Sequence, residues 1–243
     1  MAKLERYQQN IGINGITKEA QEKLFSAKVA VIGAGALGSG VIMNLVGLGV
    51  GQIKIIDDDV VKLEDLNAQL IHRQKNISRA KVMSAKDWIQ EYNDDVKVEV
   101  DKIKLNELNY FNILNEYNII IDCLNCDETK YILNEIALRH KKILIHGSTQ
   151  GFFGQVATIA PPNSACLACI KQKPEEFKEE NFPLIAPVVS TISAIQSQEA
   201  LKAIIGGCEL LTNKLLTFDG YKSEFKTYEC NKNIVCEVCG ELN

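Results

Sequence analysis

The chain has 243 residues, 46% of them hydrophobic and 24% charged, and its formal net charge is −4. This length and apolar content predict one globular α/β domain over residues 1–243 with a full-sized core. The slightly acidic balance and the shortness of the basic runs argue against nucleic acid as a partner. No apolar stretch approaches about eighteen residues and the first segment does not resemble a secretion signal, so a cytoplasmic protein that makes no use of a membrane is expected.

The most informative feature is a glycine-rich loop that follows an apolar, β-branched run at 29–32, a pattern typical of a buried parallel strand. Gly33 is expected to allow a sharp strand-to-helix turn, and Gly35 to let backbone N–H groups approach a phosphate. Gly38 is expected to let the following helix pack closely on the strand. The N-terminus of that helix would then face the phosphates.

A second apolar run at 53–56 ends in an acidic cluster. Asp57 follows the glycines by about twenty residues, the spacing at which a carboxylate accepts hydrogen bonds from both hydroxyls of a ribose. Three glycines alone are weak evidence. The order strand, glycine loop, helix, strand and acid predicts a nucleotide site much more strongly.

Further strands are predicted at 96–100, 119–123 and 143–146, and helical patterns separate them. The helices are expected at 79–92, 105–115 and 128–140. This alternation predicts a Rossmann-like, doubly wound and mostly parallel sheet with helices on both faces.

In the final third of the chain, strands and helices no longer alternate regularly. Strands are expected at 155–160, 215–218 and 224–228, the last two as an antiparallel pair that extends the sheet. A long apolar helix is expected at 188–205, where Gly206 and Gly207 end it. The segment 171–187, which begins with a run rich in proline, lysine and glutamate, is predicted to be a mobile crossover loop.

Two Cys-x-x-Cys pairs lie in this region, formed by Cys166, Cys169, Cys236 and Cys239. Each pair can occupy two corners of a tetrahedron, so together they predict a closed, structural four-thiolate zinc site that pins the C-terminal extension. A redox dithiol and unpaired surface thiols are the alternatives. Cys123 and Cys126 have the same spacing, but no second pair remains for them and buried thiols are expected there.

The glycine loop, the acidic strand end, Lys81 and the two late cysteine pairs together resemble the ThiF/MoeB/HesA family, bacterial E1-like adenylyltransferases related to ubiquitin-activating enzymes. The resemblance extends from Arg6 to Gly240. It implies a homodimer that uses ATP and Mg²⁺ to adenylate the C-terminal glycine of a small β-grasp carrier protein of the ThiS/MoaD kind, or of a peptide. The pathway, whether thiamine, molybdopterin or peptide modification, is left open.

The resemblance also assigns roles to single residues. Lys81 matches the family lysine that stabilises the transition state, although a solvated lysine on an exposed helix turn is the alternative. Asn67 and Gln69 match polar positions that line the phosphates. Asp59 belongs to the same expected nucleotide site, and Asn125 stands at the position of a metal-linked aspartate.

Three positions depart from the family pattern. Gln9 and Ala68 stand where the family has arginines, and Asn125 replaces its aspartate. Guanidinium groups stabilise a transferring phosphoryl group, so their loss is expected to slow the reaction. Arg6, Arg73 or an arginine supplied by a partner are candidates to compensate for them.

Three functions therefore compete. The leading hypothesis is an ATP-dependent adenylyltransferase, in which Asp127 or Asp59 helps to hold Mg²⁺. The alternative is a catalytically degenerate E1-like subunit that binds a carrier or a catalytic partner without adenylating it. A nicotinamide-dependent enzyme is a third hypothesis, but the chain is short for a second catalytic domain.

Overall fold

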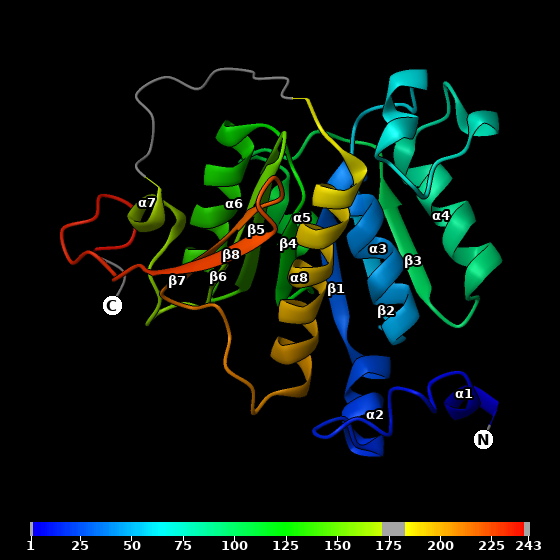
Figure 1. The fold of residues 1–243 in the computed structure, drawn as a ribbon, viewed down its shortest axis with the longest axis horizontal. Helices are drawn as coiled ribbons and strands as arrows, with labels where there is room; N and C mark the ends of the chain where they lie inside the picture. Colours follow the sequence, from blue (N-terminus) through cyan, green and yellow to red (C-terminus); the bar gives the residue numbers. More distant parts are fainter. Residues whose placement is uncertain (1, 172–182, 241–243) are drawn as a thin grey trace.

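The computed structural model describes residues 2–171 and 183–240. An eight-stranded sheet runs through the molecule in the order β3-β2-β1-β4-β5-β6-β7-β8 (Figure 1). The strands are β1 (Lys28–Ile32), β2 (Gln52–Ile56), β3 (Lys97–Asp101), β4 (Ile119–Asp122), β5 (Ile143–Gln150), β6 (Phe153–Ile159), β7 (Lys214–Asp219) and β8 (Glu224–Glu229). Strands β1 to β5 pair in parallel, and β6 to β8 continue the sheet antiparallel. The predicted doubly wound sheet with an antiparallel extension is confirmed.

Helices cover both faces of this sheet (Figure 1). They are α1 (Ala2–Glu5), α2 (Lys18–Ser26), α3 (Ala36–Leu48), α4 (Lys81–Tyr92), α5 (Tyr110–Leu114), α6 (Asp127–Arg139), α7 (Leu167–Ile170) and α8 (Ala186–Ile205), with 3-10 turns at Leu63–Asn67 and Gln74–Asn76. One core lies under α2, α3, α4 and α8, and a second lies under α5 and α6. Among the described residues, no helix combines the length and apolar character that crossing a membrane requires.

Strand β1 shows why the parallel strands read as continuous apolar runs. Val29 and Val31 enter the core beneath α3 and α8, whereas Ala30 and Ile32 enter the core beneath α5 and α6. A strand that is buried on both faces, as β1 is, favours apolar residues throughout its interior. Its carboxyl end is therefore where the first turn and the first polar groups occur.

The register of the parallel strands aligns their carboxyl ends. Ile32 of β1 lies beside Asp122 of β4, which in turn lies beside His146 of β5. The chain leaves β1 toward β2 on one side and enters β4 on the other, so strand order reverses between β1 and β4. This reversal is the point at which open α/β sheets bind ligands.

One predicted helix is mostly absent. The pattern at 105–115 indicated a helix, but only α5 forms there. The side chain of Asn106 accepts hydrogen bonds from the backbone N–H groups of Leu108 (2.9 Å) and Asn109 (3.2 Å), and the Asn109 amide donates to the Lys104 carbonyl (3.0 Å). Asparagine side chains that bond nearby backbone groups compete with helical hydrogen bonds, which explains the shortened helix.

Most of the crossover predicted at 171–187 lies outside the described residues. Its end is part of the sheet region, because the backbone N–H of Gly151 donates to the Pro183 carbonyl over 2.8 Å. Helix α8 begins at Ala186, two residues before the predicted start at 188. It ends as expected at Gly206, where φ is 75°.

Candidate nucleotide site

The glycine loop joins β1 to α3 in the predicted way. Gly33 has φ of 100°, and a Cβ atom there would lie 2.6 Å from the Cys123 carbonyl oxygen, so only glycine fits. Gly35 is the N-cap of α3. A Cβ added to Gly35 would meet nothing closer than Gln69 Nε2 at 3.9 Å. The loop therefore has open space next to the N-terminus of α3, where unpaired backbone N–H groups favour an anion.

Asp57 lies at the carboxyl end of β2 and braces this loop. Its Oδ2 accepts from the Ala34 backbone N–H (2.7 Å), and its Oδ1 accepts from the Asp59 backbone N–H (2.8 Å). A carboxylate has about four lone-pair sites, so two acceptor positions remain for ribose hydroxyls.

Lys81 is a buried lysine set among carboxylates, which rules out the solvated alternative in this structure. Its Nζ lies 2.9 Å from Asp59 Oδ2 and 3.5 Å from Asp65 Oδ2, and its side chain is 8% exposed. Burial by itself lowers the pKa of Lys81, but the Asp59 hydrogen bond and the nearby charge of Asp57 outweigh it and hold the pKa above its ordinary value. The ammonium therefore stays charged at neutral pH.

The pKa of Asp59 moves the other way. Burial raises the pKa of Asp59. The hydrogen bonds from Lys81 and the Val60 backbone N–H, together with the charges of Lys81 and Lys62, lower it by more. The carboxyl pKa is therefore below its ordinary value. An ionised Asp59 oxygen is a ligand type that Mg²⁺ prefers. The residues present thus fit a magnesium ion at this position.

The 3-10 turn after β2 brings Gln69 to the glycine loop. Its Nε2 donates to Asp65 Oδ1 over 2.7 Å, while its Oε1 is enclosed and has no hydrogen-bond partner among the described residues. Asn67 is exposed on the same turn, with its amide 3.4 Å from the Leu184 carbonyl. Ala68 is buried between them and adds no charge.

His72 supports the loop from behind, a role that the sequence did not predict. Its Nε2 lies 2.8 Å from the Ala34 carbonyl oxygen and its Nδ1 lies 2.8 Å from Ser84 Oγ on α4. Burial lowers the His72 pKa more than the hydrogen bond to the Ala34 carbonyl raises it. A neutral ring that donates from Nε2 and accepts from the Ser84 hydroxyl satisfies both contacts. A lone histidine between loops gives no sequence signal for this bridge.

The next strand ends contribute a buried acid–base pair. His146 Nδ1 and Asp122 Oδ2 are 2.7 Å apart, and both side chains are buried. Burial lowers the pKa of His146 although Asp122 raises it, so the imidazole is neutral near pH 7. Asn125 is exposed in the turn that follows β4. It therefore lies at the same edge of the sheet as the glycine loop.

The arginines that were candidates to compensate are engaged elsewhere. Arg6 donates to the Tyr92 carbonyl over 3.1 Å, and Arg73 pairs with Glu91 over 2.9 Å on the surface. Asp127, a candidate magnesium ligand, pairs with Lys171 over 2.8 Å. Neither of these two guanidinium groups is thus placed beside the glycine loop.

Gln9 is not brought to this site by its own chain. Gln9 lies two residues after Tyr7, and the contacts of Tyr7 fix the position of this segment. The Tyr7 ring packs so closely on Gly49 that a Cβ there would lie 2.6 Å from it, and the Tyr7 hydroxyl accepts a hydrogen bond from Asn93 Nδ2 over 2.7 Å. Gly49 and Asn93 end α3 and α4, so this segment lies at the amino ends of the strands, opposite the glycine loop (Figure 1).

The four cysteines gather as predicted. Their Sγ atoms all lie within 4.8 Å of one another. Cys166 Sγ is 3.9 Å from the Sγ atoms of Cys169 and Cys236, and Cys169 Sγ is 3.5 Å from Cys239 Sγ. A zinc tetrahedron with Zn–S bonds of about 2.3 Å has edges of roughly 3.8 Å. Burial raises the pKa of the Cys166 thiol to about 11.

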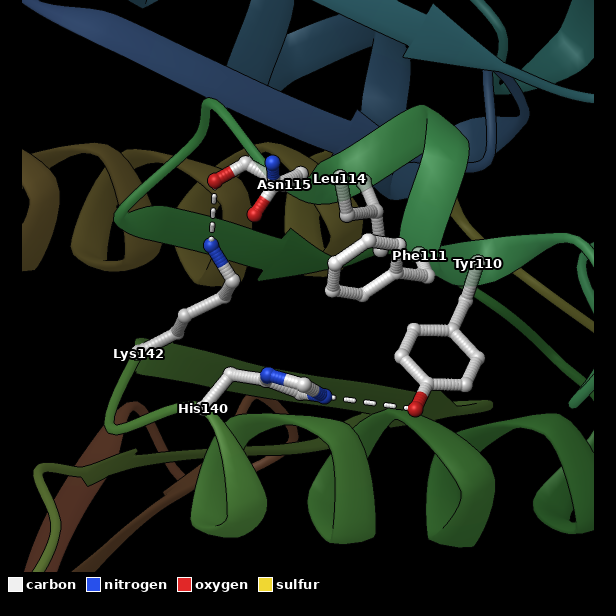
Figure 2. Close-up of a pocket in the computed structure, with 6 residues that line it drawn as sticks. All are labelled: Tyr110, Phe111, Leu114, Asn115, His140 and Lys142. Atoms are coloured by element: carbon white, nitrogen blue, oxygen red, sulfur yellow. Dashed lines mark hydrogen bonds between the residues drawn. The ribbon is translucent and has the colours of Figure 1, made fainter.

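A small pocket elsewhere in the molecule is separate from this site. Figure 2 shows its lining side chains, which are Tyr110, Phe111, Leu114, Asn115, His140 and Lys142. Lys142 and Asn115 precede β5 and β4 respectively. The pocket therefore lies at the amino ends of the strands, away from the glycine loop.

Comparison with known proteins decides the family. The profile of the ThiF family matches residues 7–238, nearly the whole chain. The chain belongs to the ThiF family.

Relatives and solved structures agree with this assignment. The ThiF-family chain is 32% identical over 243 residues to the adenylyltransferase and sulfurtransferase MOCS3 of Culex quinquefasciatus, covering 98% of this chain and 56% of that relative. It is 30% identical to the SAMP-activating enzyme E1 of Haloferax volcanii, covering 98% of this chain and 89% of the relative. The crystal structure of Escherichia coli MccB with MccA-N7isoAsn superimposes with a TM-score of 0.87 at 21% identity, covering 98% of this chain and 75% of MccB. This last likeness shows the fold.

The ThiF-family loop gives a sharp stability prediction at Gly38. A Cβ at Gly38 would lie 2.0 Å from the Gly33 carbonyl oxygen, whereas a Cβ at Gly47 on the same helix meets nothing within 4 Å. We expect Gly38→Ala to lower the free energy of unfolding by roughly 1–3 kcal/mol through overpacking. The control Gly47→Ala should raise it by up to about 1 kcal/mol through helix propensity. Urea unfolding measures both, and equal stabilities for the two variants would contradict the tight contact.

Proposed function

We propose that this ThiF-family protein is an ATP-dependent adenylyltransferase. It activates the C-terminal carboxylate of a small β-grasp sulfur-carrier protein, or of a peptide with a C-terminal glycine, as an acyl adenylate. The observation that carries the proposal is a charged, buried lysine among three aspartates, beside a glycine loop at the point where strand order reverses. The names of the relatives, one an adenylyltransferase and one an E1 that activates a SAMP, support this substrate class.

Each end of the nucleotide has a place in this proposal. Asp57 accepts the ribose hydroxyls, and Gly33, Gly35 and Gly38 leave room for the phosphates at the start of α3. Asn67 and Gln69 add amide groups beside them. The enclosed Oε1 of Gln69, which lacks a partner among the described residues, marks this spot as one where a ligand or water donates a hydrogen bond.

The reaction joins two anions, so its main requirement is positive charge. An oxygen of the acyl carboxylate attacks the α-phosphorus, the bond from that phosphorus to the bridging oxygen breaks, and pyrophosphate leaves with the electron pair. No proton is transferred in this step. Lys81 supplies a permanent ammonium, and Mg²⁺ held by Asp59 would supply further neutralising charge. Asn125 offers an amide near the reacting groups in place of a carboxylate.

The proposed assembly is a homodimer, and the proposed structural metal is zinc. Within one chain, Gln9 lies near the amino ends of the strands, whereas the glycine loop lies at their carboxyl ends. Gln9 therefore approaches a nucleotide only if a second copy of the chain places it there. Zinc is proposed for the four cysteines because their sulfur spacing matches a closed tetrahedral site. Such a site has no open position and takes no part in the chemistry.

The test is ATP–pyrophosphate exchange driven by a panel of peptides and β-grasp proteins that end in Gly-Gly. Exchange that requires a free C-terminal carboxylate, and that disappears when the terminus is amidated, is the expected result. Absence of exchange with tight carrier binding would instead support the non-catalytic subunit, in which Gln9, Ala68 and Asn125 mark a lost activity.

A further inference from the structure

Among the residues that the structure describes, four lysines are buried: Lys54, Lys81, Lys130 and Lys142. A buried ammonium is costly unless carboxylates or carbonyls pair with it. Lys54 lies 2.9 Å from Asp101 Oδ2, and Lys81 has the partners already described. Lys142 donates to the carbonyls of Asn115 (3.0 Å) and Tyr117 (2.8 Å), the first of which Figure 2 shows.

Lys130 differs from the other three. It is 4% exposed, yet among the described residues it has no carboxylate within 4.0 Å and no hydrogen bond. Its nitrogen is also not one of the fully enclosed polar atoms that lack a partner. The ammonium therefore retains a small contact with solvent, through which a ligand can reach it. A buried ammonium with no ion pair and no hydrogen bond to a described residue calls for an anion as a direct partner.

The position of Lys130 is defined by its neighbours. It lies in the first turns of α6, directly after the turn that follows β4, and that turn contacts the glycine loop where Gly33 meets the Cys123 carbonyl. The charge of Lys130 is close enough to influence the pKa values of Cys123, Asp127 and His146. Lys130 thus belongs to the carboxyl ends of β4 and β5.

A second buried group without a partner lies at the same strand ends. His146 donates from Nδ1 to Asp122, which leaves Nε2 as an acceptor, and this enclosed Nε2 has no hydrogen bond among the described residues. The C-terminus of a peptide carries a carboxylate, which pairs with a cation, and N–H groups, which donate to an acceptor. Lys130 and His146 Nε2 supply a cation and an acceptor in one region.

The order of the strands assigns this region to one of the two reactants. Along the edge of the sheet, Asp57 ends β2, the glycine loop ends β1, and Lys130 stands beside the ends of β4 and β5. A nucleotide with its ribose at Asp57 and its phosphates at the glycine loop occupies the first two strands. The ends of β4 and β5 are left for the group that attacks the α-phosphorus.

We infer that Lys130 binds the C-terminal carboxylate of the acyl substrate and holds it against the α-phosphate. This inference rests on the proposed function. The ammonium orients the carboxylate and takes no proton. Ala68 and Gln9 carry no charge, and Lys130 supplies part of the missing positive charge on the side of the acyl substrate. His146 positions the terminal peptide unit beside it.

The test compares Lys130→Met with the matched control Lys142→Met. Both remove a buried ammonium and keep the volume of the side chain. Lys130→Met should raise Tm by a few degrees, since it removes a buried charge that has no ion pair or hydrogen bond to a described residue, and should raise the peptide KM in ATP–pyrophosphate exchange by at least about 10-fold. Lys142→Met should lower Tm, because it leaves two carbonyls unpaired, and should keep the peptide KM within about 2-fold of the wild type.

Two further measurements separate the possible outcomes. Lys130→Arg keeps the charge and should recover most of the peptide KM, while the Kd of ATP, measured by calorimetry, should be unchanged in Lys130→Met. A weakened ATP Kd with an unchanged peptide KM would place Lys130 on the nucleotide and overturn the inference, as would a peptide KM that Lys130→Met does not alter. If the wild type itself shows no exchange with any Gly-Gly terminus, the proposed function fails first and the inference fails with it.

Discussion

Replacement of Lys81 by methionine should weaken Mg²⁺-dependent binding of ATP by about 10- to 150-fold, the range that corresponds to one lost hydrogen bond to a charged group, about 1.5–3 kcal/mol. Lys81 is a buried cation beside the site, and the neighbouring aspartates hold its pKa above its ordinary value. Its removal takes the ion pair from Asp65 and leaves Asp59 with Lys62 as its remaining ion-pair partner among the described residues, so the triphosphate would meet carboxylates that are less well compensated. Calorimetric titration with ATP, at a Mg²⁺ concentration that saturates the wild type, measures the effect.

Lys54 provides a matched control for this experiment. It is also buried and also contacts two carboxylates, Asp101 at 2.9 Å and Glu99 at 3.6 Å, but it lies within β2 rather than at the carboxyl end of the strand. Lys54→Met should change stability and leave the ATP Kd within about 2-fold of the wild type. Equal ATP affinities in the Lys81→Met variant and the wild type would mean that the aspartates keep this lysine away from the phosphates.

The elements that position the site were predictable because they carry strong local signals. Strands such as β1 and β4 are buried on both faces, so their sequences are short apolar runs that end at the polar groups of the site. The glycine loop needs its residue type at Gly33 and Gly38 because a backbone carbonyl occupies the space of a Cβ atom in each case. The cysteine cluster was predictable because two Cys-x-x-Cys pairs are a local sequence pattern, and together they provide the four ligands of one metal site.

The partners of the charged side chains were not predictable in this way. Lys81 was expected to stabilise the transition state, but the sequence did not show that Asp59 and Asp65 would be its partners, because no local pattern encodes which acid a long side chain reaches. His72 was given no role, although it joins the glycine loop to α4. The helix predicted at 105–115 was wrong over its first half because the turn chemistry of Asn106 outweighed the apolar spacing.

The C-terminal tail depends on the cysteine cluster more than on packing. Ile234 and Val235 are 84% and 78% exposed, so the segment just before Cys236 buries almost no apolar surface. By contrast, Cys166 and Cys239 lie in the core beneath α5 and α6. A metal that joins the two pairs would therefore hold a tail that has little else to fix it.

Replacement of Cys236 by serine should accordingly remove the metal and free the tail. We expect the wild type to contain about one zinc ion per chain, and the variant to lose it with a loss of several kcal/mol of stability, or roughly 10 °C in Tm. Trypsin should then cleave after Lys232 much faster than in the wild type. Zinc content by plasma mass spectrometry, Tm by calorimetry and the mass of the tryptic product measure the three effects.

Cys208 is the matched control, because it is an exposed thiol outside the cluster, and Cys208→Ser should keep the zinc and the Tm. The redox alternative for the same four residues predicts a different pattern. A dithiol would leave the purified protein without zinc, and its Tm would respond to oxidant and reductant but not to a chelator. A Cys236→Ser variant that keeps its zinc would contradict the four-thiolate site, whereas loss of metal and tail protection together would tie the fold of the C-terminal extension to the metal.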